Sequence, residues 1–125
     1  MNLYNKLVRD KVPATIVARG RSAVTRDLVG VELLRALRAK IDEEVSEYDA
    51  AAHDDQAAEE LADLIEVIMA LAKQRGFDEA AIQAIRAARA DERGVFDLGH
   101  FLIAVEYPAA PPADARDGPA PPRAV

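Results

Sequence analysis

The segment that decides the fold runs from residue 43 to residue 63 and reads EEVSEYDAAAHDDQAAEELAD. It opens with a Glu-x-x-Glu motif, Glu44 and Glu47, and closes with a Glu-x-x-Asp motif, Glu60 and Asp63. If the segment folds as a helical hairpin about residues 53–55, the two motifs become mirror images, because the pairings 47–60 and 44–63 share one midpoint. Residues three apart share a helix face at about 5–6 Å. Four carboxylates at matching heights would repel one another, so the arrangement predicts a bound cation.

The charge of the chain is also unevenly distributed. Residues 42–66 contain eleven acidic side chains and no Lys or Arg, whereas residues 1–41 contain nine basic and three acidic ones. An acidic run is most often a solvated helix face. An acidic centre beside a basic flank also suits a site that holds a divalent cation and a polyanion together.

Helical phase favours the second interpretation. At about 100° per residue, Glu44 falls inside the apolar arc of its helix and Glu60 inside the arc of the next helix, while Glu47 and Asp63 fall on the margins. Glu43 is turned outward in the same projection. A carboxylate in a buried seam is costly unless it is paired or bound to a metal. The phase therefore predicts that Glu44, Glu47, Glu60 and Asp63 are metal ligands.

The composition narrows the choice of metal. The chain has no Cys, which excludes thiolate zinc sites, iron–sulfur clusters and disulfides. Its two histidines, His53 and His100, do not stand in the Glu-x-x-His motifs of di-iron helix bundles. Carboxylate oxygens suit hard cations, so we expect Mg²⁺ first and Mn²⁺ second. Because Mg²⁺ completes its coordination with substrate phosphates, the site points to phosphate chemistry.

Several stretches together resemble a known family. The acidic motif pair, with its twelve-residue spacer, resembles the all-α nucleoside triphosphate pyrophosphohydrolase superfamily, the MazG-like group. The run YNKLVRDKVP at residues 4–13 resembles the opening of its phosphoribosyl-ATP pyrophosphohydrolase-like branch, and so do KIDEE at 40–44 and ERGVF at 92–96. The resemblance covers residues 4 to about 103.

This resemblance implies Mg²⁺-dependent hydrolysis of a nucleoside triphosphate, standard or modified, to a monophosphate and pyrophosphate. It implies the same four carboxylates as catalytic residues and metal ligands, with Glu43 as an outer group. Basic side chains would offset the phosphate charge, and the candidates are Lys40, Arg9, Lys11, Arg89 and Arg93. Lys40 is equally well explained as a surface ion pair with Glu44 at i, i+4. The stripe of Arg86, Arg89 and Arg93 also fits an ordinary solvated helix face.

Two other functions remain open at this point. One is phosphoribosyl-ATP pyrophosphohydrolase activity in histidine biosynthesis, which shares the fold and the metal site. The other is a non-catalytic protein that binds a metal–nucleotide complex as a sensor or assembly module. The intact set of four carboxylates argues against the second, because a protein that only binds could lose one of them.

A chain of 125 residues predicts one domain. We expect an all-α domain at residues 1–107, with a short irregular N-terminal segment and helices at about 13–20, 28–51, 56–74 and 78–93. Residues 101–107 are apolar and predict a short strand or an extended arm. Six of the seven prolines fall within residues 108–125, which predicts a disordered tail.

The expected partners follow from charge and apolar pattern. No apolar run is long enough to span a bilayer and no signal peptide is recognisable, so we expect a soluble cytoplasmic protein without a membrane partner. The net charge of −6 disfavours nucleic acid. The apolar arc of the third expected helix is about 200° wide. This predicts a homodimer or homotetramer in which hairpins from two copies form a four-helix core.

Overall fold

The computed structural model describes residues 1–107, so the tail expected at 108–125 lies outside the described residues. The chain forms α1 (Val12–Ala18), α2 (Gly30–Asp49), α3 (Asp54–Gln74) and α4 (Glu79–Arg93). Residues 1–107 contain no strand, which confirms the all-α class. Residues 101–107 are neither helix nor strand, so the strand alternative for this segment is wrong.

The helix ends follow from local chemistry. Pro13 lies in the first turn of α1, where its missing N–H costs nothing. His53 caps α3 because its Nδ1 accepts a hydrogen bond from the backbone N–H of Gln56 at 3.2 Å. The Oε1 of Gln56 in turn accepts from the N–H of Ala52 at 3.0 Å, as in a capping box. Asp78 caps α4, since its Oδ1 accepts a hydrogen bond from the N–H of Ala81 at 2.8 Å.

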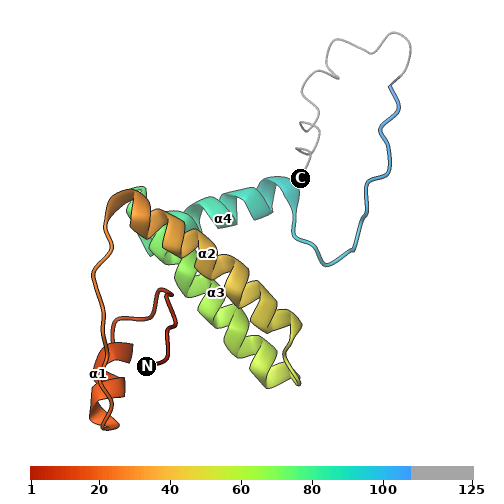
Figure 1. The fold of residues 1–125 in the computed structure, drawn as a ribbon. Coiled ribbons are helices and arrows are strands. Elements are labelled where there is room, and N and C mark those ends of the chain that lie inside the picture. The colour runs from red at the N-terminus through yellow and green to blue at the C-terminus, as the bar shows by residue number, and fades with distance from the viewer. Residues whose placement is uncertain (108–125) are drawn as a thin grey trace. The chain divides into compact units, whose positions relative to one another are not determined.

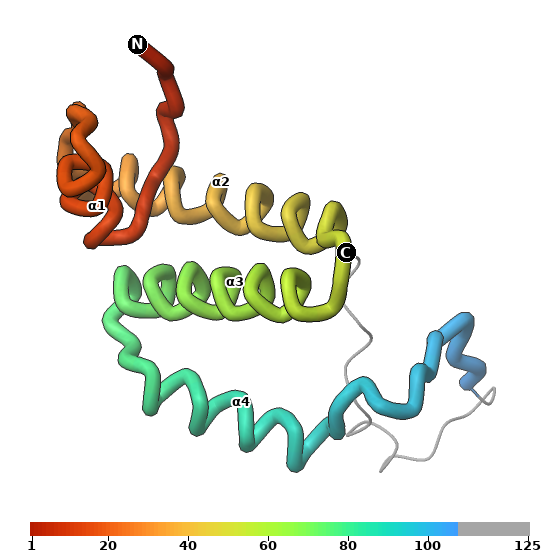
Figure 2. Tube along the Cα trace, turned by 90° about the horizontal axis from the view of Figure 1, so that it is seen from below, coloured from red at the N-terminus to blue at the C-terminus, as the bar shows by residue number. Residues whose placement is uncertain are grey.

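Helices α2 and α3 run antiparallel and lie side by side in both views (Figures 1 and 2). Their contact buries two large apolar side chains, Leu37 of α2 and Val67 of α3, which are 5% and 8% exposed. No other apolar side chain of the described part of the chain is buried to this extent. The predicted hairpin is therefore present, but its core within one copy of the chain is small.

The N-terminal segment before α1 is irregular, as expected, and ion pairs hold it on the hairpin. The Nζ of Lys6 lies 3.4 Å from Glu43 Oε1 on α2. The Arg9 guanidinium donates to Asp63 Oδ1 on α3 at 2.5 Å. One short segment thus contacts both helices of the hairpin beside the acidic motifs.

Backbone contacts divide the chain into two units, residues 1–92 and the residues from Arg93 onward. The first unit contains the hairpin, α1 and nearly all of α4. The described part of the second unit, beyond the end of α4 at Arg93, carries exposed apolar side chains and no further helix. The domain predicted at 1–107 stays a prediction. No helix among the described residues has the length and apolar character needed to cross a bilayer.

Candidate metal centre

Three acidic side chains converge where α2 and α3 face each other near the hairpin turn. Helix α2 supplies Glu44 and Glu47, and α3 supplies Glu60. One carboxylate oxygen from each of the three lies within 4.8 Å of the other two. The i, i+3 spacing within α2 and the antiparallel register of the hairpin together produce this cluster.

Burial makes the cluster unusual. Glu44 is 4% exposed, which makes it the one buried charged residue among residues 1–107. The Oε2 atoms of Glu44 and Glu60 are inaccessible to solvent, and neither has a hydrogen-bond partner within the described chain. A buried carboxylate oxygen without a partner is costly. Three hard oxygen donors around such atoms fit a cation of the Mg²⁺ class.

The proximity of the three carboxylates changes the titration of Glu60. A protonated Glu60 can donate a hydrogen bond to Glu47, and this is the main reason that its pKa is raised from 4.5 to about 7. Desolvation of Glu60 and the nearby Glu44 carboxylate act in the same direction. Near neutral pH and without a cation, a proton held on Glu60 therefore reduces the repulsion among the three carboxylates.

Lys40 provides a positive charge next to the cluster. Its Nζ lies 3.3 Å from Glu44 Oε1 and 3.0 Å from Glu43 Oε1. Burial disfavours the charged ammonium, but the hydrogen bonds and charges of Glu43 and Glu44 outweigh it, so the pKa of Lys40 is raised. The side chain is 17% exposed, which is lower than expected for a surface ion pair. The burial of both partners favours a role at the site over the surface-pair alternative.

Asp63, the fourth expected ligand, is not part of the cluster of three. Its carboxylate instead accepts the hydrogen bond from Arg9 described above. Arg9, a candidate substrate-binding residue, therefore does lie at the acidic site. Lys11, Arg89 and Arg93 are exposed, and none of these three side chains forms an ion pair with the described residues.

The structure adds two residues that helical phase missed. Glu43 is not turned into solvent, because Lys6 and Lys40 both contact its carboxylate. Burial of Glu43 acts to raise its pKa, but the hydrogen bonds and charges of Lys40 and Lys6 outweigh burial, so the pKa of Glu43 is lowered. The prediction that Glu43 faces away was wrong because the projection considered the helix alone and not the segment that crosses it. Lys6 belongs to the YNKLVRDKVP run, so the family resemblance of that run was the available signal.

The fold and this cluster define an all-helical protein with a carboxylate-lined candidate cation site. The chain is similar to an uncharacterized protein of Mycolicibacterium smegmatis (strain ATCC 700084 / mc(2)155), with 50% identity over 54 residues. That match covers 43% of this chain and 55% of the relative, so the chain spans about half the length of the curated relative. No protein-family model matches the chain. No solved structure matches it either.

Proposed function

We propose that the chain is a Mg²⁺-dependent nucleoside triphosphate pyrophosphohydrolase that releases pyrophosphate and a nucleoside monophosphate. The observation that carries the proposal is the convergence of Glu44, Glu47 and Glu60 around two buried, partnerless carboxylate oxygens. Such a set is unfavourable on its own and becomes favourable when a divalent cation is bound. The family resemblance of residues 4–103 supplies the reaction class.

Glu44, Glu47 and Glu60 would hold the cation, with Mg²⁺ preferred over Mn²⁺. The bound metal would supply Lewis-acid chemistry, namely a lowered pKa for water and neutralisation of phosphate charge. Burial of Glu44 keeps its carboxylate fixed, and Lys40 orients that carboxylate through the contact to its Oε1. Preorganised ligands of this kind lower the cost of binding.

Three basic side chains are placed to bind the triphosphate. Lys40, Lys6 and Arg9 each contact an acidic side chain of the hairpin, which holds them at the site before substrate arrives. Arg9 offers a planar guanidinium suited to bidentate phosphate contacts, and the lysines act as point charges. Lys6 and Arg9 are 43% and 55% exposed, so their charged groups are accessible to a substrate.

A base is needed to take the proton of the attacking water. Asp63 is the acidic residue of the two motifs that the cluster does not use, and its side chain is 39% exposed. The Arg9 contact fixes the position of the Asp63 carboxylate, whose oxygens are the proposed proton acceptor. We therefore assign the base role to Asp63 and the ligand role to the other three.

The test of the proposed function is pyrophosphate release from a panel of NTPs, dNTPs and phosphoribosyl-ATP, measured with Mg²⁺ and with EDTA. Release that requires Mg²⁺ supports a hydrolase, and the preferred substrate separates housekeeping hydrolysis from histidine biosynthesis. Tight binding of a metal–nucleotide complex without any release would overturn the hydrolase and leave a sensor.

Mg²⁺ affinity should depend on pH through Glu60. The metal-free folded protein holds a proton on Glu60 up to about pH 7, whereas the unfolded chain releases it near 4.5. Because the folded state binds more protons in this window, its stability falls as pH rises from 4.5 to 7. Mg²⁺ needs the ionised carboxylate, so its affinity rises over the same range.

We expect Mg²⁺ to bind about ten-fold more weakly at pH 6 than at pH 8, as a pKa near 7 requires. Isothermal titration calorimetry at the two pH values measures this ratio. In Glu60→Gln the ratio should shrink toward one. Equal Mg²⁺ affinity of the wild-type protein at both pH values would contradict the assignment of Glu60 as a ligand.

The assembly state belongs to the same proposal. One face of α3 carries Leu61, Ile65 and Ile68, which are 45%, 53% and 40% exposed in a single copy. Val45 and Tyr48 of α2 are similarly exposed, at 42% and 44%. A homodimer or homotetramer with a four-helix core would cover these side chains. We expect the active form to be such an assembly and to act in the cytoplasm, without nucleic acid.

A further inference from the structure

The segment at residues 95–107, here called the arm, is the longest stretch of uncovered apolar side chains in the described chain. Eight large apolar residues of the arm are at least half exposed, and Phe96, Phe101 and Ile103 reach 99%, 88% and 90%. Isolated exposed apolar residues are ordinary, but a contiguous set marks an interaction surface.

The end of the arm has a pattern suited to docking. In an extended segment alternate side chains point to opposite faces. If residues 101–107 dock in an extended conformation, Phe101, Ile103, Val105 and Tyr107 share one face, which is entirely apolar, while Glu106 lies on the other. Residues 95–107 carry Asp97 and Glu106 and no Lys or Arg, so the arm is acidic as well as apolar.

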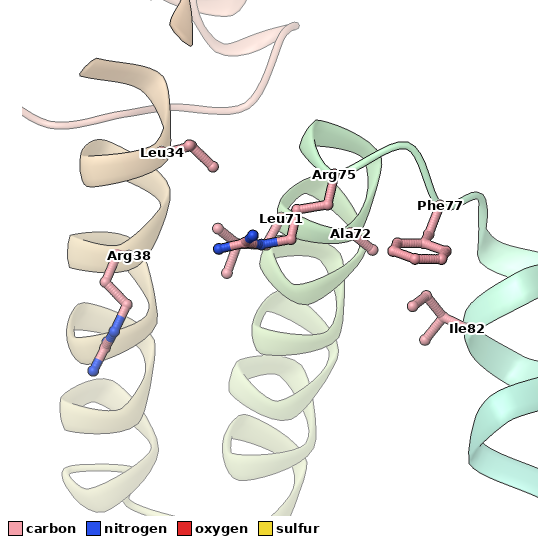
Figure 3. A pocket seen from close by; sticks show the side chains of 7 residues that line it. All are labelled: Leu34, Arg38, Leu71, Ala72, Arg75, Phe77 and Ile82. Carbon is pink, nitrogen blue, oxygen red and sulfur yellow. The ribbon is translucent and has the colours of Figure 1, made fainter. Parts of the chain in front are cut away.

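A groove that is apolar and positively charged, and so complementary to the arm, lies on the first unit (Figure 3). It is at the end of the hairpin away from the metal centre. It has a volume of about 520 Å³, within the range of sites that bind organic groups. Its apolar lining comes from α2, α3 and the start of α4, and consists of Leu34, Leu71, Ala72, Phe77 and Ile82.

Two arginines give this groove a positive charge. Arg38 and Arg75 complete the lining, and in Figure 3 the Arg75 side chain extends past Leu71 toward α2. Arg38 already pairs with Asp42 at 2.9 Å, whereas Arg75 has no ion pair within the described residues. An apolar groove beside an unpaired arginine matches an apolar arm that carries acidic residues.

We propose that the arm of one copy docks in the groove of a second copy, and that two copies exchange arms reciprocally. A two-fold exchange covers both arms and both grooves at once. The proposal does not rest on the proposed hydrolase activity.

Disulfide crosslinking tests the proposal cleanly, because the chain has no cysteine. One chain carries Ala72→Cys in the groove, and a second chain, distinguished by a size tag, carries Ile103→Cys in the arm. Both variants are mixed, allowed to exchange and oxidised gently. We expect a mixed covalent dimer at twice the 13.5 kDa chain mass, plus the tag, on a non-reducing gel.

The matched control is Ala62→Cys, which removes the same residue type from an exposed position of α3. It should crosslink to Ile103→Cys several-fold less than Ala72→Cys does. Arg75→Glu should lower the yield of the mixed dimer, and adding Glu106→Arg to the arm should restore it. Equal yields from positions 62 and 72, or no crosslink at all, would overturn the proposal.

A chain carrying both Ala72→Cys and Ile103→Cys separates exchange from self-docking. Reciprocal exchange gives covalent dimers, whereas an arm in its own groove gives a crosslink within the single-chain mass. The second result, without any mixed dimer, would show that the groove takes the arm of its own chain and would refute the exchange.

Discussion

Replacement of Glu60 by Gln should reduce the rate of Mg²⁺-dependent pyrophosphate release roughly 100-fold or more. Loss of a residue that only hydrogen-bonds to a metal ligand typically costs about 10–100-fold, and loss of a ligand itself should cost more. The substitution keeps the shape of the side chain and removes its charge. Because Glu60 contributes one of the converging oxygens, its loss weakens both the hold on the cation and the placement of the phosphates. The rate is measured at saturating Mg²⁺, so that loss of affinity and loss of turnover can be separated by titration.

The adjacent residue provides a matched control for this prediction. Glu59 is exposed and one position away on α3, so Glu59→Gln makes the same chemical change outside the cluster. We expect the rate of pyrophosphate release by Glu59→Gln to stay within about two-fold of the wild-type rate, because Glu59 is an exposed, solvated charge. The metal-free Glu60→Gln protein should be folded, because the substitution also removes carboxylate repulsion. Similar losses from both variants would contradict a specific site.

Helical periodicity was sufficient to predict the hairpin and most of its acidic site. A period of 3.6 residues decides which side chains face the neighbouring helix, and it correctly placed Glu44 in the buried seam. It could not separate the two sides of the apolar stripe on α3. Val67 faces α2 and is buried, whereas Leu61 and Ile68 remain 45% and 40% exposed. The sequence alone does not say how many surfaces cover a wide apolar arc.

The contacts of the N-terminal segment were beyond sequence reasoning for a different reason. Lys6 to Glu43 and Arg9 to Asp63 join residues 37 and 54 positions apart. An irregular segment has no periodicity from which its path can be derived, so only the family resemblance suggested that it lies near the site. Asp63 pairs with Arg9 and is not part of the cluster of three, which no phase count anticipates.

Replacement of Ile65 by Asp, in a chain whose arm docking is already weakened by Arg75→Glu, should convert the protein to single chains. Leu61, Ile65 and Ile68 occupy positions i, i+4 and i+7 of α3 and therefore form one stripe. In one copy this stripe is about half exposed, while the hairpin buries only Leu37 and Val67 among its large apolar residues. So small a core is insufficient for a domain of this size without further burial. A second copy packed on the stripe would supply that burial, and a charge at its centre would be unfavourable there.

Light scattering on eluted protein measures the native mass. We expect a multiple of the 13.5 kDa chain mass for the wild type and the single-chain mass for the chain with Ile65→Asp and Arg75→Glu at the same concentration. The thermal midpoint of the wild type should rise with protein concentration and that of the variant should not, because association stabilises only the assembled form. Val24→Asp, at a 90% exposed apolar residue outside the hairpin, should leave the mass unchanged. A wild-type protein at the single-chain mass would refute the assembly.

The same variant separates assembly from cation binding. Glu44, Glu47 and Glu60 all come from one hairpin, so the single-chain form still contains every carboxylate of the cluster. We therefore expect the Ile65→Asp variant to bind Mg²⁺ as long as the hairpin stays folded. The substitution should lower the thermal midpoint and leave the cation site intact. If Mg²⁺ affinity falls together with the mass while the helical circular dichroism is unchanged, the cluster depends on the second copy. In that case a partner side chain, or the constraint of the four-helix core, completes the cation site.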